Sequence, residues 1–167
     1  MRSHEVYRQY THLIAWKSRK EHGRGAGIRT GEGNAAMKIA YGTYAMPTIP
    51  LEEALPALAQ MGYDGVEVCI GPNHVGSMPD QMDAARRERV RGLLDEHSLG
   101  VPALFLAGHI YTENSEEHRA TLDHLRVCAE LARDLGLREP PVLAIGLGGR
   151  SDQWDTARET LVRLLAG

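Results

Sequence analysis

The chain lacks several features that would narrow its class at once. It has only two cysteines, Cys69 and Cys128, without CxxC spacing, so neither a disulfide framework nor a structural zinc site is indicated. No apolar stretch approaches the roughly 18 residues that cross a bilayer, and the N-terminus lacks the apolar core of a secretory signal peptide. We therefore expect a cytoplasmic protein with no membrane partner, in which both thiols are buried apolar filler.

The charges are divided unevenly along the chain. Residues 1–36 hold seven Lys and Arg against three Asp and Glu, a net charge of +4, whereas residues 37–167 hold twelve against nineteen, a net charge of −7. The first segment is also rich in glycine and has no sustained apolar period, so we expect a flexible N-terminal extension over 1–36 and one domain over 37–167. Met37 would then be the natural start, with a basic arm or a targeting peptide as the alternatives. The acidic domain argues against a nucleic-acid partner.

From Met37 onward, short apolar runs alternate with segments of helical period. The pattern predicts strands at 38–44, 66–70, 101–107 and 142–147, and helices at 50–61, 80–97, 116–135 and 151–165. Gly62, Gly100 and Gly136 close successive units and lie 38 and 36 residues apart. Repeated strand–helix units of this size predict an α/β fold with a parallel sheet and right-handed crossovers.

Local signals predict details of two helices. Ser115 precedes two glutamates and is the expected N-cap of the helix at 116–135. Pro56 removes a backbone hydrogen bond inside the helix at 50–61, so we expect a bend there.

The candidate chemistry lies where parallel strands end, because α/β sheets and barrels place their sites at the carboxyl ends of their strands. Glu67 and His109 are the predicted catalytic or orienting residues; a salt bridge for Glu67 and a plain hydrogen bond for His109 are the structural alternatives. We expect the two to share one end of the sheet with Tyr41. The predicted substrate-binding residues lie at two kinds of place, the ends of strands and the glycine-rich turn before the last helix. The N-terminus of that helix would attract phosphate. The residues are Tyr41, Thr43, Tyr111, Gly148 and Arg150.

The segment Gly62-Tyr-Asp-Gly-Val-Glu-Val68, together with the histidine after the third strand, resembles the sugar-phosphate isomerase/epimerase family of the xylose isomerase-like TIM barrel superfamily. The resemblance covers residues 37–165 and implies a (β/α)₈ barrel, of which this chain would supply about four of eight units, the N-terminal half. It also resembles the endonuclease IV group at this histidine. That group runs His-x-x-Tyr, whereas this chain has His109-Ile-Tyr111, so a metal-dependent nuclease is disfavoured.

The resemblance implies an isomerase or epimerase that moves a proton beside the carbonyl of a sugar or sugar phosphate. The family uses a divalent metal, Mn²⁺ or Mg²⁺ with Zn²⁺ as an alternative, held by residues of later strands that have no counterpart here. Two strong candidates, Glu67 and His109, are too few to hold such an ion tightly against water. We therefore expect weak or no metal binding and negligible turnover by this chain alone. The alternative is a non-catalytic half-barrel that pairs with itself, as a homodimer, or with a second half.

Overall fold

The computed structural model describes residues 13–17 and 37–148, and the single positions 154, 155, 158, 159 and 162. Its sheet has five strands in the order β1-β2-β3-β4-β5. The first is antiparallel to the second, and the other pairs are parallel. The strands are β1 (Leu13–Lys17), β2 (Met37–Gly42), β3 (Gly65–Ile70), β4 (Leu104–His109) and β5 (Leu143–Gly146). The predicted α/β fold is confirmed: four parallel strands curl into a half-barrel, as in a partial TIM barrel.

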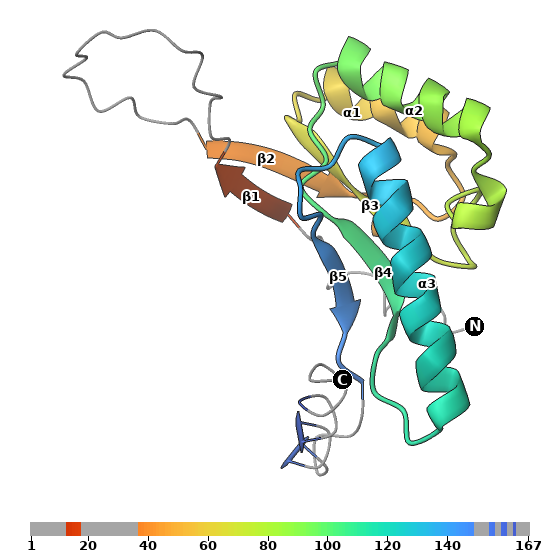
Figure 1. Ribbon diagram of the computed structural model, residues 1–167. Helices are drawn as coiled ribbons and strands as arrows, with labels where there is room; N and C mark the ends of the chain where they lie inside the picture. The colour runs from red at the N-terminus through yellow and green to blue at the C-terminus, as the bar shows by residue number, and fades with distance from the viewer. Residues whose placement is uncertain (1–12, 18–36, 149–153, 156–157, 160–161, 163–167) are drawn as a thin grey trace, which may run out of the picture.

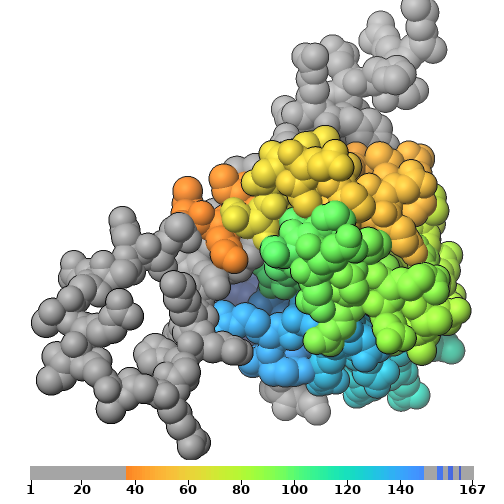
Figure 2. Space-filling view, turned by 90° about the horizontal axis from the view of Figure 1, so that it is seen from above, coloured from red at the N-terminus to blue at the C-terminus, as the bar shows by residue number. Residues whose placement is uncertain are grey.

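Three helices connect the parallel strands and cover one face of the sheet (Figure 1). They are α1 (Leu51–Gln60), α2 (Ala84–Glu96) and α3 (Ser115–Asp134), with 3-10 turns η2 (Thr43–Ala45) and η3 (Pro79–Gln81). Figure 2 views the molecule from above Figure 1, and the orange, yellow, green and blue segments follow one another in an arc.

Alternation along the strands separates two faces. Val66, Val68 and Ile70 of β3 belong to the hydrophobic core, together with Leu55 and Leu58 of α1. Cys128, Leu131 and Ala132 of α3 are buried in the same core. Because side chains alternate along a strand, Glu67 and Cys69 lie on the opposite, concave face. Both are buried as well, with 6% and 1% of their surface exposed.

The structure shifts several predicted boundaries. The strand predicted at 101–107 is β4. It begins at Leu104 rather than at residue 101, because Pro102 has no N–H to donate to a ladder. It continues to His109 past an irregularity after Leu106. The long second helix begins at Ala84, where the Asp83 side chain accepts a hydrogen bond from the Arg86 N–H at 2.8 Å. Before it, a proline at the start favours the separate turn η3.

The structure differs from the sequence-based predictions at the start of α3 and in the segment before Met37. The N-cap of α3 is Asn114 and not Ser115: the Asn114 side chain accepts hydrogen bonds from the backbone of Glu116 and Glu117. Residues 13–17 form a strand, although the sequence predicts no strand before Met37. The helix expected at 151–165 lies almost entirely outside the described residues.

α1 runs through Pro56 without interruption. In the described part of the chain, no helix combines the length and apolarity needed to cross a membrane.

Candidate functional site

The signature segment that starts at Gly62 is largely a structural joint between α1 and β3. Gly62 has a φ of +86°, a conformation that glycine adopts without strain. The Asp64 side chain accepts a hydrogen bond from the Ile39 N–H at 2.9 Å, and the Asp64 N–H donates to the Ile39 carbonyl at 2.8 Å. Tyr63 packs edge-on against Tyr41, with ring centroids 5.3 Å apart. These contacts fix the amino end of β3 beside β2 and leave Glu67 as the segment's functional candidate.

Tyr41 lies on the helix-covered face. It is level with Val66 of the core in the β2–β3 register, and neighbouring parallel residues share a face. Its predicted substrate contact stays a prediction, while its observed contact is the packing against Tyr63. Glu67 is level with Gly42 on the concave face.

Thr43 holds the first two parallel strands together beyond their ladder. It is 5% exposed, and its hydroxyl oxygen accepts a hydrogen bond from the Cys69 N–H at 2.8 Å. Burial, reinforced by the negative charge of Glu67, raises the pKa of the Cys69 thiol to about 12. Burial likewise raises the pKa of Cys128 to about 11, so both thiols stay protonated at neutral pH. This agrees with the expectation that the two are buried apolar filler.

Three aromatic rings meet beside the carboxyl ends of β2 and β3: Tyr44 in η2, His74 in the loop after β3, and Phe105 near the start of β4. The Tyr44 and Phe105 rings are edge to face, with centroids 5.5 Å apart and an interplanar angle of 89°. The His74 ring lies 5.6 Å from Tyr44 at 33°. Phe105 is level with Cys69 and so shares its concave face. We call these three side chains the aromatic group; with 39% of Tyr44 exposed, it is accessible to a ligand.

Phe105 is a site residue that the sequence pattern does not single out. It lies inside a continuous apolar run, which predicts a strand at 101–107 and does not tell its two faces apart. Its position between the core residues Leu104 and Leu106 places it on the other face, and this alternation is the signal that could have revealed it.

Glu67 and His109 do not come together. Glu67 is level with Ala103, one residue before the Val68–Leu104 pair, and Ala103 is level with Val142. His109 is level with Gly146, four residues further along β5, which corresponds to about 13 Å of strand. Glu67 lies mid-strand and buried, whereas His109 is exposed at the strand end. The catalytic roles of Glu67 and His109 stay predictions. If both residues contacted the same ligand, that ligand would have to span this distance.

The remaining predicted residues lie around His109. A Cβ atom at Gly148, whose φ is +78°, would come within 2.7 Å of the His109 ring, so the glycine allows this close packing. The Tyr111 hydroxyl donates to Glu113 at 3.1 Å, and this hydrogen bond raises the pKa of Tyr111. Arg150 lies outside the described residues.

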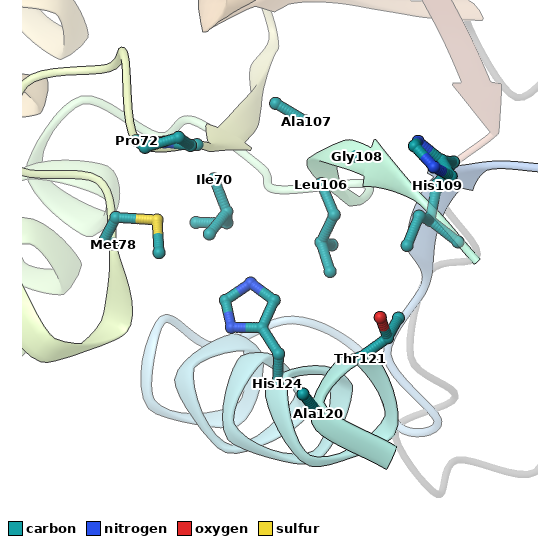
Figure 3. Close-up of a pocket in the computed structure, with 12 residues that line it drawn as sticks. Ile70, Pro72, Met78, Leu106, Ala107, Gly108, His109, Ala120, Thr121 and His124 are labelled. Carbon is teal, nitrogen blue, oxygen red and sulfur yellow. The ribbon is translucent and has the colours of Figure 1, made fainter. Parts of the chain in front are cut away.

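A pocket of about 290 Å³ lies between the strand ends and α3, on the helix-covered side. Figure 3 shows His124 pointing from α3 toward Ile70 and Leu106, which belong to the core. His109 lies at the margin with its ring directed away from His124. Because most of its lining is apolar and it faces α3, we place the candidate site at the aromatic group and not in this pocket.

The described residues do not fit a divalent-metal centre. Among them, no three His, Cys, Asp or Glu side chains are grouped so that they could hold an ion. Weak metal binding by this chain stays a prediction.

Comparison with known families agrees with the curled sheet. A sequence model of the xylose isomerase-like TIM barrel family matches residues 55–166. The chain belongs to this family. No curated protein matches the chain. In barrels of this kind, the active site is built at the carboxyl ends of the strands, and the aromatic group of this xylose isomerase-like chain lies beside the ends of β2 and β3.

Proposed function

We propose that the aromatic group binds a sugar or sugar phosphate and that the protein acts in its isomerisation or epimerisation. The observation that supports this proposal most is the meeting of Tyr44, His74 and Phe105 beside the carboxyl ends of β2 and β3. Aromatic faces bind the C–H surfaces of sugar rings, and mouths of this kind bind small molecules. The family membership supports barrel chemistry in general, since the superfamily includes isomerases, epimerases and endonuclease IV.

The expected reaction moves a proton beside a carbonyl, and such a step requires a positioned acid or base. Among the described residues, the aromatic group would hold the carbon skeleton, while His109 and Tyr111 offer polar atoms at and just after the end of β4. Glu67 would orient a ligand or its neighbours from the concave face. These residues would thus bind and orient, and not act as the principal acid and base.

Ligand titration of matched tyrosine variants tests the proposal. Tyr44→Leu removes an aromatic face from the site, whereas Tyr63→Leu removes a tyrosine from the helix-covered side. With a panel of ketoses and ketose phosphates followed by calorimetry, Tyr44→Leu should weaken binding by up to about tenfold, since an aromatic contact contributes ~0.5–1.5 kcal/mol. Tyr63→Leu should lower the melting temperature and keep the dissociation constant. Equal affinity in Tyr44→Leu and the wild type would contradict the proposal.

A second candidate, a half-barrel that pairs with another copy, is favoured by the edge of β5. Among the described residues, this strand pairs with β4 alone. A free edge offers unpaired backbone groups to another chain.

A further inference from the structure

The loop that carries His74 is closed by its own hydrogen bonds. Ser77, which is 3% exposed, accepts from the Gly71 N–H at 3.2 Å, and its hydroxyl lies within donating distance of the carbonyls of Gly71 (3.3 Å) and His74 (3.2 Å). Residues 71–77 therefore form a compact loop with both ends held together.

The loop is also fastened to the segment after β2. The Val75 N–H donates to the Pro47 carbonyl at 2.9 Å, and Nε2 of His74 lies 3.2 Å from the Tyr44 carbonyl oxygen. A Cβ atom at Gly71 would come within 3.2 Å of Nδ1 of His74, so the ring rests against the glycine backbone. These contacts set the position of the His74 ring beside Tyr44.

Arg86 of α2 holds the far side of this loop. Its Nη1 donates to the Gly76 carbonyl at 2.7 Å and to the Gln81 carbonyl at 3.2 Å. Its Nε and Nη2 donate to the two carboxylate oxygens of Glu52 on α1, at 2.8 and 2.9 Å. The Arg86 side chain is only 16% exposed. One guanidinium of α2 thus makes four hydrogen bonds: two to Glu52 of α1, one to Gln81 of η3 and one to Gly76 of the loop.

The guanidinium also packs closely against the loop at Gly76. Gly76 has a φ of +62°, and a Cβ atom there would come within 2.2 Å of Nη1 of Arg86. The planar fork of arginine makes a bidentate contact with a carboxylate, which a lysine ammonium cannot reproduce. The Glu52 carboxylate binds Nε and Nη2 of Arg86, and Nη1 is left to donate to the Gly76 carbonyl of the loop.

We propose that Arg86 is a positioning residue, which holds residues 71–77 so that His74 stays against Tyr44 in the aromatic group. The positional claim stands on the contacts alone, and only the nature of the ligand rests on the proposed function. Arg86 touches no residue of the aromatic group directly in the contacts above, so it acts through Gly76 and the loop.

NMR of the histidine side chains tests the claim in the ligand-free protein, with the His74 signals assigned by a His74→Gln variant. Arg86→Met should move the His74 ring protons downfield, because they lose the shielding of the Tyr44 ring, and should lower the melting temperature. Arg87→Met is the matched control: Arg87 bonds to Asp134 at 2.7 Å and to the carbonyls of Met82 and Pro79, away from the loop. It should lower the melting temperature and leave the His74 signals in place.

Arg86→Lys keeps the positive charge and provides a second variant if Arg86→Met fails to fold. Its His74 ring protons should show the same downfield shift. Unchanged His74 signals in either folded Arg86 variant, or an equal shift in Arg87→Met, would overturn the proposal. Titration of the same proteins with the ketose panel separates the two claims. A His74 shift in a protein whose wild type binds no ketose supports the positioning role and counts against the sugar site.

Discussion

At the scale of single residues, Thr43 shows how a correctly placed residue can have a different task. The sequence places it at the end of the first parallel strand, and the structure does so too, just beyond β2. Its hydroxyl oxygen, however, is taken by the Cys69 N–H inside the protein. A hydroxyl used in this way contributes to the site by holding η2, and therefore Tyr44, against β3.

Replacement of Thr43 measures this contribution. Thr43→Val keeps the shape and removes the acceptor, so the buried Cys69 N–H loses its partner, which costs about 1–3 kcal/mol. We expect urea denaturation to show a fall of this size in the free energy of unfolding. Thr43→Ser retains an acceptor oxygen and should lose less. A loss in Thr43→Ser with none in Thr43→Val would show that the methyl group, and not the hydrogen bond, matters at this position.

The types and positions of the residues predicted the site only in part, because they do not show on which face of the sheet a side chain lies. Tyr41 and Tyr44 both stand near the end of a strand, but only the register shows that Tyr41 shares the face of Val66. The face on which an aromatic side chain lies depends on pairing with a neighbouring strand, which is a non-local property. Local periodicity inside a continuous apolar run does not contain it.

At the scale of elements, period and glycine spacing were sufficient for the order of strands and helices. The strand at β1 escaped prediction because its five residues lie in a glycine-rich, basic context and gain a ladder only from β2. The position is informative: β1 pairs with the edge of β2 that a closing strand would use in a complete barrel. The division of the chain at residue 36 stays a prediction.

The start of α3 gives a test at this scale, because predicted and observed caps are neighbours. Asn114→Ala removes the side chain that accepts from Glu116 at 2.9 Å and should destabilise the protein by about 1 kcal/mol. Ser115→Ala should change stability far less, since serine lies inside the helix and alanine is the better helix former. Thermal denaturation of both variants decides between the caps. A larger loss in Ser115→Ala would restore the sequence-based assignment.

At the scale of the whole molecule, the sheet ends in two edge strands, β1 and β5. Among the described residues, β1 pairs with β2 alone and β5 pairs with β4 alone. Val142, just before β5, is 57% exposed and adds apolar surface at this edge. Native proteins often protect such edges with charged side chains, which disfavour pairing with another chain. We therefore expect self-association to use β5.

Light scattering over a range of protein concentrations tests this expectation. The wild type should form a dimer as concentration rises, and Val142→Lys should weaken the association at least about tenfold, which corresponds to ~1.4 kcal/mol. Val127→Lys is the matched control, because Val127 is 42% exposed on α3, away from the edge, and it should associate like the wild type. Because lysine at an exposed position barely affects folding, all three proteins should melt within a few degrees of one another. A wild type that stays monomeric throughout would contradict this expectation, whereas equal weakening by both substitutions would point to net charge and not to the edge.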